Sequence, residues 1–398
     1  MNKPACRPYL LFAIDTSRAS IGSGSFSAAV EAIKAFACNE DALKCYGKVG
    51  VMTYDRIIQF FALRNGHHDP QLVIMSDIND PFVPMQDALF FDPVACSSQF
   101  SALISSLHAM HQEPKIVESC FGAAVSVALD AVKPFGGRIV FFQTALPNYG
   151  PGALKSRDVG ASAPSDKPHP LLFPQGDYYQ KLGKAASEQG VAISLVCTPA
   201  GFIDLATIGQ LVTLTSGVSW HLSKFNPQLH TTKLVNDLVS WLGLPFAFDI
   251  ILRVRCGSGL QAKAYFGHCT TQNQTDYVFG GLNSEQSFAV LMEYDGKLSE
   301  RERISFQCAA LYTDSITGQR RIRVINLALS ATSQMQPIFR MSELDSILSF
   351  YVKKNISQIL EAPSAAFPAS FTAKCVNILS AYRRYCAANT PSGQVSCA

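Results

Sequence analysis

The first two thirds of the chain alternate between short apolar runs and longer segments in which apolar residues recur every three or four positions. Continuous apolar runs occupy residues 9–15 (YLLFAID), 138–146 (RIVFFQTAL) and 191–197 (VAISLVC), which is the pattern of strands buried on both faces. Segment 25–37 (SFSAAVEAIKAFA) has helical spacing instead. Short links between such strands and helices predict an α/β fold, in which a mostly parallel sheet is covered by helices on both faces.

Three further segments complete this region. Residues 47–55 (GKVGVMTYD) and 57–63 (IIQFFAL) predict a β-hairpin, and residues 204–215 (DLATIGQLVTLT) predict one helix. Residues 152–177 are rich in Pro, Gly, Ser and Ala, so we expect a long loop there.

The pattern then changes to short strand-like segments that follow one another with Gly, Asp, Asn and Ser turns between them. The absence of helical spacing in this stretch predicts an antiparallel β-domain. Its predicted strands are residues 249–256, 261–269, 287–295, 304–313 and 320–329. Residues 342–360 and 371–388 have the apolar spacing of amphipathic helices.

These changes divide a chain that is too long for one ordinary core, since it has 398 residues. We expect an A-type α/β domain over residues 1–245, a β-sandwich over residues 246–336 and a helical domain over residues 337–398.

Charge and cysteine usage narrow the classes of function. The formal net charge of +3 is too small to predict nucleic-acid binding. Charged residues make up 16% of the chain, against about 25% in typical soluble proteins, so we expect a partner to cover part of the surface. The 12 cysteines include no Cys-x-x-Cys pair, and no signal peptide or long apolar run is present. We therefore expect reduced structural thiols in a cytoplasmic protein.

The end of the first apolar run carries part of a metal-site motif. Asp15 and Ser17 have the Asp-x-Ser spacing of von Willebrand A-type domains, but Ala19 stands where the motif needs a second serine. Two later loops have Cys120 and Gln143 at positions where a threonine and an aspartate are expected. Magnesium needs near-octahedral oxygen ligation, so we predict that the site at Asp15 and Ser17 is degenerate and holds no metal.

Two arginines in the β-domain are the strongest candidates for ligand binding. Side chains alternate along a strand, so Arg253 and Arg255 project from one face about 6 to 7 Å apart. An extended Asp-x-Glu peptide has the same two-residue period, and each guanidinium suits bidentate binding of a carboxylate. A pair of solvated arginines on an open sheet face remains the alternative.

Several longer blocks resemble the Sec24 family, the cargo-adaptor subunit of the inner COPII vesicle coat. They occur in the family's order and span nearly the whole chain. The blocks are residues 76–84 (SDINDPFVP), 150–158 (GPGALKSRD), 204–211 (DLATIGQL), 253–260 (RVRCGSGL) and 320–329 (RRIRVINLAL).

This resemblance implies a fold and a binding pocket. It implies a trunk domain of A-type fold with a degenerate metal site, then a β-sandwich and part of a helical domain. It also implies that Arg253 and Arg255 belong to a pocket for acidic export signals, which Leu311 lines. The family's zinc module has no counterpart in these residues, so no cofactor is expected in this chain.

The resemblance further implies a non-enzymatic coat subunit that selects cargo for transport from the endoplasmic reticulum to the Golgi. Its expected partners are the Sec23 subunit, bound through the trunk, acidic cargo tails and SNARE proteins, with the small GTPase of the coat as an indirect partner. We expect it at endoplasmic reticulum exit sites, where Arg320, Arg321 and Arg323 either meet anionic lipid or form a solvated strand edge.

Two alternatives from other classes remain open. One is a metal-dependent A-type binding protein, which would use Asp15 and Ser17. The other is a cysteine-dependent enzyme, which would need a thiol with a depressed pKa beside a histidine.

Overall fold

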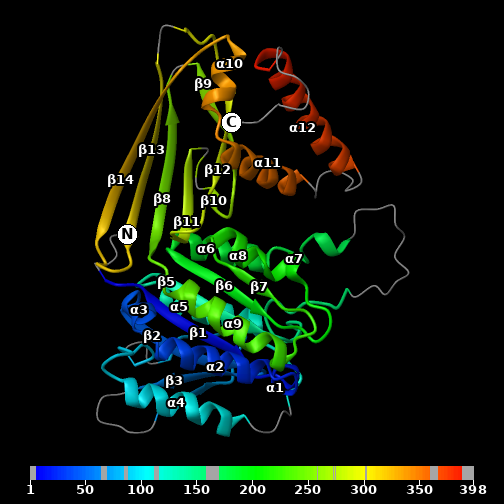
Figure 1. Ribbon diagram of the computed structural model, residues 1–398. Helices are drawn as coiled ribbons and strands as arrows, with labels where there is room; N and C mark the ends of the chain where they lie inside the picture. The colour runs from blue at the N-terminus through cyan, green and yellow to red at the C-terminus, as the bar shows by residue number, and fades with distance from the viewer. Residues whose placement is uncertain are drawn as a thin grey trace.

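The structure is a computed structural model that describes most of the chain in several ranges. The described residues are 6–63, 70–84, 88–111, 116–157, 170–257, 259–271, 273, 275–300, 303–358 and 366–387. An α/β domain carries a tall β-sheet region, and a group of helices lies beside the sheets (Figure 1). The loop predicted over residues 152–177 is described only at its ends, because residues 158–169 lie outside these ranges. The predicted helical domain is likewise described only in part.

The α/β domain is built on a seven-stranded sheet in the order β4-β3-β2-β1-β5-β6-β7. Its strands are β1 (Tyr9–Asp15), β2 (Lys48–Tyr54), β3 (Ile58–Ala62), β4 (Gln71–Met75), β5 (Gly137–Gln143), β6 (Val191–Cys197) and β7 (Ser219–His221). Strands β2, β1, β5, β6 and β7 are parallel, whereas at one edge β3 pairs antiparallel with β2 and β4 pairs antiparallel with β3. The predicted mostly parallel sheet is confirmed, and so is the hairpin, which consists of β2 and β3.

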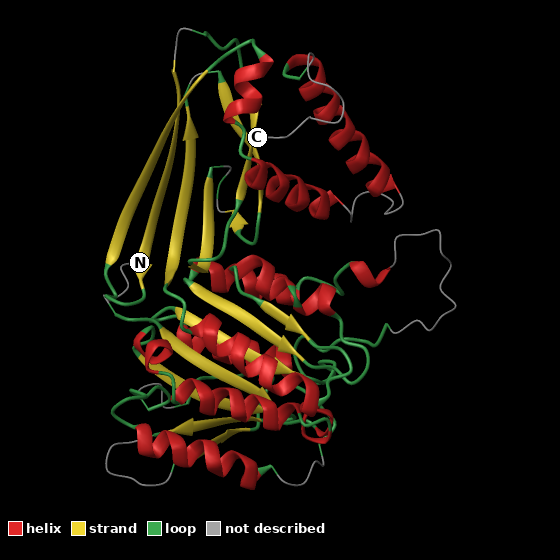
Figure 2. Cartoon of the chain, in the orientation of Figure 1, coloured by secondary structure: helices red, strands yellow, loops and turns green. Residues whose placement is uncertain are grey.

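Helices cover both faces of this sheet (Figure 2). They are α1 (Arg18–Gly22), α2 (Ser25–Ala37), α3 (Glu40–Lys44), α4 (Ser97–Met110), α5 (Phe121–Val132), α6 (Tyr178–Glu188), α7 (Leu205–Ile208), α8 (Gln210–Thr215) and α9 (Pro227–Leu242), with a 3₁₀ turn at Pro170–Leu172. Because side chains alternate along a strand, β1 contributes to two cores. Leu11 and Ala13 pack with α5 and α6, while Phe12 and Ile14 pack with α2, α4 and α9.

The helix predicted over residues 204–215 differs from the observed structure, because it is divided into α7 and α8 at Gly209. Glycine has a low helix propensity, which explains the break at this position. Asp204 caps α7, since its Oδ1 accepts a hydrogen bond from the Thr207 N–H at 3.2 Å. The same carboxylate pairs with Arg157, whose Nη2 lies 2.6 Å from Oδ2.

The region after residue 245 forms two antiparallel sheets. The larger has the order β10-β11-β8-β13-β14 and the smaller is β12-β9. Their strands are β8 (Phe246–Cys256), β9 (Leu260–Phe266), β10 (Thr270–Thr271), β11 (Asp276–Asn283), β12 (Ala289–Tyr294), β13 (Arg303–Asp314) and β14 (Arg320–Ser330). Ile250 and Leu252 of β8 and Tyr277 and Phe279 of β11 form the core of this region. The predicted antiparallel β-sandwich is thereby confirmed.

Strand β11 has no counterpart among the predicted strands. Two glycines, Gly280 and Gly281, interrupt its apolar residues and weaken the strand pattern. The structure supplies the reason for the first glycine, because a Cβ at Gly280 would lie 2.3 Å from the carbonyl oxygen of Val191. The backbone of β11 therefore lies directly against β6 of the α/β domain.

Strand β8 begins inside the core of the α/β domain, where Phe246 and Phe248 are buried. The guanidinium carbon of the buried Arg138 lies 3.9 Å from the ring centre of Phe246 and 4.2 Å from that of Trp241. Its Nη1 donates a hydrogen bond to the Tyr46 hydroxyl at 3.0 Å. Cation–π attraction is strongest away from water, so the contacts of Arg138 with these aromatic side chains stabilise the packing of β8 against the α/β domain.

The last described segments are α10 (Met335–Met341), α11 (Leu344–Gln358) and α12 (Ala366–Tyr385). Phe350 of α11 packs against Phe266 of β9, with ring centres 5.6 Å apart. Tyr382 of α12 packs against Phe339 of α10 at 5.4 Å. Within the described ranges, no helix combines the length and the apolar character that a membrane span requires.

Candidate functional site

The two predicted arginines lie side by side on one face of the larger sheet. The register between β8 and β13 places Leu311 on the same face as Arg253 and Arg255. The residues between them, such as Leu252 and Val254, point to the opposite face and pack in the sandwich core. The structure therefore brings all three predicted site residues together outside that core.

Arg253 has an internal partner. Asp276 at the start of β11 lies directly opposite it, and both Nε and Nη2 of Arg253 donate to the two Asp276 carboxylate oxygens. The Arg253 side chain is 39% exposed and that of Asp276 is 10% exposed. The hydrogen bond from Arg253 holds the pKa of Asp276 below its usual value.

Asp276 is absent from the predicted site because β11, which begins with it, is absent from the predicted strands. The available signal was an aspartate immediately before the apolar residues 277–279, which a strand assignment would have placed beside β8.

Arg255 is exposed and retains an available charge. Its Nη1 donates a long hydrogen bond of 3.4 Å to Gln307 Oε1, and no described carboxylate forms an ion pair with it. Arg255 lines an open crevice of about 450 Å³ together with Ser305, Gln307 and Asn326. A ligand carboxylate can therefore reach this guanidinium without displacing an acidic group.

The predicted degenerate metal site is buried at the carboxyl edge of the parallel sheet, where Asp15 and Ser17 have no exposed surface. Asp15 Oδ1 accepts a hydrogen bond from the Ser17 N–H at 2.8 Å. Its Oδ2 accepts hydrogen bonds from the N–H groups of Thr144 and Ala145, each at 3.0 Å. Burial raises the pKa of Asp15, and these backbone hydrogen bonds oppose that rise. The carboxylate thus joins the loops that follow β1 and β5.

The other positions of the metal motif also form internal contacts. Gln143 Nε2 donates to Ser119 Oγ at 3.1 Å and to the Ala145 carbonyl at 2.6 Å. Its Oε1 accepts a hydrogen bond from the Tyr54 hydroxyl at 2.6 Å. Cys120 is buried, and burial raises the pKa of its thiol to about 12. In the described part of the chain, no three His, Cys, Asp or Glu side chains gather into a metal-binding group.

The basic edge of β14 is partly neutralised by acidic residues of the same chain. Arg320 Nη1 lies 2.8 Å from Asp249 Oδ2, and Arg321 Nη1 lies 3.1 Å from Asp314 Oδ2. Two of the three arginines that could meet anionic lipid are therefore paired.

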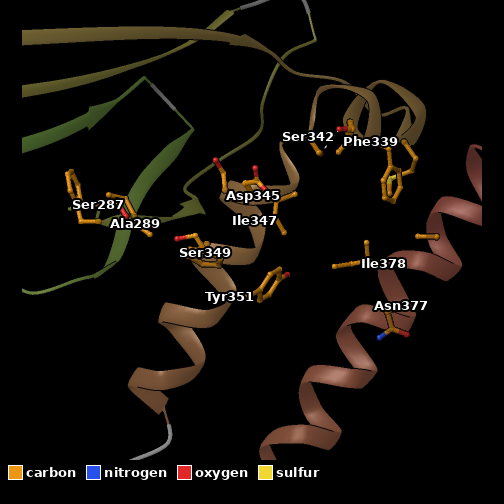
Figure 3. A pocket seen from close by; sticks show the side chains of 17 residues that line it. Ser287, Ala289, Phe339, Ser342, Asp345, Ile347, Ser349, Tyr351, Asn377 and Ile378 are labelled. Atoms are coloured by element: carbon orange, nitrogen blue, oxygen red, sulfur yellow. Dashed lines mark hydrogen bonds between the residues drawn. The ribbon is translucent and has the colours of Figure 1, made fainter. Parts of the chain in front are cut away.

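A larger crevice, of about 990 Å³, lies between β12 and helices α10, α11 and α12. The side chains of Tyr351 and Ile378 point toward each other across it (Figure 3). Its lining is mainly apolar, with Phe339 and Phe350 among the larger side chains. No charged group of the predicted site contributes to this crevice, so it is separate from the arginine pair.

Comparison with known proteins shows a consistent relationship. Residues 5–242 match the Sec23/Sec24 trunk domain, and residues 247–332 match the Sec23/Sec24 beta-sandwich domain. The chain is 33% identical to protein transport protein SEC24 B of Arabidopsis thaliana over 392 residues, which cover 96% of this chain and 35% of that protein. It is 29% identical to protein transport protein Sec24C of Homo sapiens over 405 residues, which cover 99% of this chain and 37% of that protein.

Solved structures agree with this relationship. The crystal structure of the human COPII-coat protein Sec24c superimposes with a TM-score of 0.87 at 28% sequence identity, covering 97% of this chain and 52% of that chain. The chain therefore spans a little over a third of the length of the curated relatives named above.

Proposed function

This chain belongs to the Sec23/Sec24 family, and we propose that it is a non-enzymatic COPII coat subunit that selects cargo for export from the endoplasmic reticulum. In this proposal it pairs with a Sec23 subunit through the α/β domain, hereafter the trunk, and acts at the cytoplasmic face of exit sites. Its similarity to proteins named as transport proteins and as a COPII-coat protein supports this assignment.

The observation that carries cargo selection is the arrangement of Arg253, Arg255 and Leu311 on one sheet face. A guanidinium has five N–H donors, and Asp276 engages one on Nε and one on Nη2 of Arg253. Three N–H groups of Arg253 remain for a ligand. An extended Asp-x-Glu signal can then place one carboxylate at each arginine and an apolar side chain against Leu311.

Asp276 changes what this site can bind. The two arginines and the aspartate together carry a net charge of one positive unit rather than two. We therefore expect Arg255 to provide most of the attraction for an acidic peptide, while Asp276 fixes the orientation of Arg253.

Pairing with a Sec23 subunit through the trunk is supported by the exposed loop after β4. Phe82 in this loop is 63% exposed and lies between Pro81 and Pro84, which stiffen the backbone. A large apolar side chain on a rigid loop is suited to burial against a partner.

The proposal includes neither a metal ion nor a catalytic thiol. The three backbone hydrogen bonds that Asp15 accepts support the first point, since a magnesium ion would have to displace backbone donors. The second point is supported by the buried thiols of Cys120 and Cys197, whose pKa values burial raises to about 12. A nucleophilic cysteine needs the opposite shift.

The test is fluorescence anisotropy with a labelled cargo-tail peptide that contains Asp-x-Glu, measured over a salt series. We expect a Kd of roughly tens to hundreds of micromolar, since a flexible peptide loses conformational entropy on binding. Arg255→Glu should weaken binding at least tenfold and leave the Arg253–Asp276 pair intact. Leu311→Ala should weaken binding about threefold through loss of apolar contact.

Arg323→Glu is the matched control, because it reverses an exposed arginine on β14 outside the predicted site. It should bind the peptide as wild type does. Equal weakening by Arg323→Glu and Arg255→Glu would indicate a non-specific charge effect and would refute the assignment of the site.

A further inference from the structure

A crevice of about 840 Å³ lies at the carboxyl edge of the trunk sheet, away from the arginine pair on β8. It is located where the strand order reverses, because β2 lies on one side of β1 and β5 on the other. Loops diverge at such a point, and open α/β sheets bind ligands there. Its walls come from the loops after β1, β5 and β6 and from the segment before α5.

The walls of this crevice combine apolar side chains with a smaller number of polar ones. Val117 is 57% exposed, and Leu146 and Phe202 are partly exposed. Ser23, Thr144, Asn148 and Ser156 add neutral hydrogen-bonding groups. Among the described residues that line the crevice, Arg18 alone is charged at neutral pH.

A backbone hydrogen bond fixes the position of Arg18, while its side chain is exposed. Its N–H donates a hydrogen bond to the Ile116 carbonyl at 2.6 Å, and the preceding Ser17 is fully buried. The described residues include no carboxylate that forms an ion pair with Arg18. The nearest acidic residue in sequence, Asp15, instead accepts three backbone hydrogen bonds. Within the described ranges, a ligand carboxylate would therefore displace no acidic partner of the Arg18 guanidinium.

We propose that this crevice binds an acidic peptide segment of a partner protein, with one carboxylate on Arg18 and a neighbouring apolar side chain against Phe202 and Leu146. The planar guanidinium matches a carboxylate with two parallel hydrogen bonds. In an A-type metal site an ion would provide positive charge at this edge, and here a side chain provides it. This site is independent of cargo selection at Arg253 and Arg255.

The composition of the crevice favours a peptide over other anions. A phosphate or a nucleic acid binds best where several cations and N–H groups converge, and this crevice offers one arginine. Apolar walls beside a single cation instead suit a carboxylate that is flanked by apolar side chains.

The experiment measures binding of a labelled capped tripeptide, acetyl-Leu-Glu-Phe-amide with an uncharged dye, by fluorescence anisotropy. The protein is the full chain carrying Arg255→Glu, so that the β8 site is weakened. We expect saturable binding, at least fivefold weaker in Arg18→Gln and about threefold weaker in Phe202→Ala. The neutral analogue acetyl-Leu-Gln-Phe-amide should bind at least fivefold more weakly than the acidic probe.

Lys184→Gln is the matched control, since Lys184 is an exposed cation on α6 outside the crevice. It should bind the probe as the parent chain does. Absence of saturable binding up to millimolar probe, equal binding by Arg18→Gln and the parent, or equal binding of the two tripeptides would each overturn the proposal. Circular dichroism of each variant verifies that the fold is retained, which is expected because Arg18 is exposed.

Discussion

The trunk and the region above it differ in how completely they bury their apolar residues. Every residue of β1, β5 and β6 in the trunk is buried, whereas every residue of β14 is exposed. The same contrast holds for side chains of one kind, since Ile14 has no exposed surface and Ile322 is 72% exposed. Apolar residues therefore form a closed core in the trunk strands, whereas on β14 they lie on an open surface.

Exposed apolar residues occur on two kinds of element in this region. On β14, Ile325 and Leu327 are each more than half exposed, and the strand pairs with β13 on one side only in the described part of the chain. On the helices, Leu344 and Leu379 are similarly exposed. Exposed strand edges and exposed apolar side chains are features at which other protein surfaces can bind. The trunk therefore buries most of its apolar residues in its own core, whereas the upper region leaves many of its apolar residues exposed.

The most severe test of this comparison removes one large apolar side chain from each region. Phe141→Ala in β5 should lower the free energy of unfolding by about 3 to 5 kcal/mol, because Phe141 is fully buried and packs against Phe121 and Tyr54. Leu327→Ala on β14 should change it by less than about 0.5 kcal/mol. Urea denaturation followed by circular dichroism measures both. Similar losses in the two variants would contradict the division into closed core and open surface.

A second test compares thiols. Cys120 and Cys197 are buried in the trunk and have pKa values raised to about 12, so few of their thiols are ionised at pH 8. Cys38 is exposed and Cys375 on α12 is partly exposed. Iodoacetamide labelling followed by mass spectrometry should modify the two trunk-core cysteines at least about a hundredfold more slowly than the other two. In urea the four rates should converge, and persistence of the difference there would assign it to local sequence instead of burial.

The smallest expected effect concerns the charge balance on β8. Asp276→Asn should tighten binding of the Asp-x-Glu peptide about threefold, because it removes a negative charge that competes for Arg253. Anisotropy over a salt series measures the change, which should diminish as salt rises. Weaker binding would show that Asp276 acts mainly by orienting Arg253.

The pH dependence of stability provides a control for Asp276→Asn, and its direction follows from the pKa of Asp276. The folded-state pKa of Asp276 lies below its usual value, so the ion pair contributes stability above about pH 4 and loses it as pH falls through the folded pKa. The difference in stability between wild type and Asp276→Asn should therefore disappear in strong acid.

The sequence was sufficient to predict the trunk because burial on both faces leaves a continuous apolar run in each central strand. Strand alternation also placed Arg253 and Arg255 on one face, whereas Leu311 was expected beside them only from the family resemblance, and the register between β8 and β13 puts it on that face. Strand β11 was missed because its glycines satisfy a tertiary requirement, the close approach to Val191, that local sequence does not reveal. The consequence was functional, because the missed strand carries Asp276.

The crevice at Arg18 illustrates a second limit. The spacing of Asp15 and Ser17 is that of a metal-site motif. The exposed charged group at this edge is instead Arg18, the residue that follows Ser17. Sequence spacing could identify the missing ligands of a metal. It could not show that Val117, Leu146 and Phe202, from three separate loops, form walls around the guanidinium.

The start of β8 has an evolutionary consequence. The sequence pattern changes at residue 246, but Phe246 and Phe248 fill the trunk core and Arg138 lies between Phe246 and Trp241. Recombination that exchanged the two halves between distant relatives at this position would separate a cation from one of its rings and leave two aromatic side chains without their cavity. We therefore expect the two halves to change in step, with substitutions at Arg138 and Phe246 covarying among descendants of this chain.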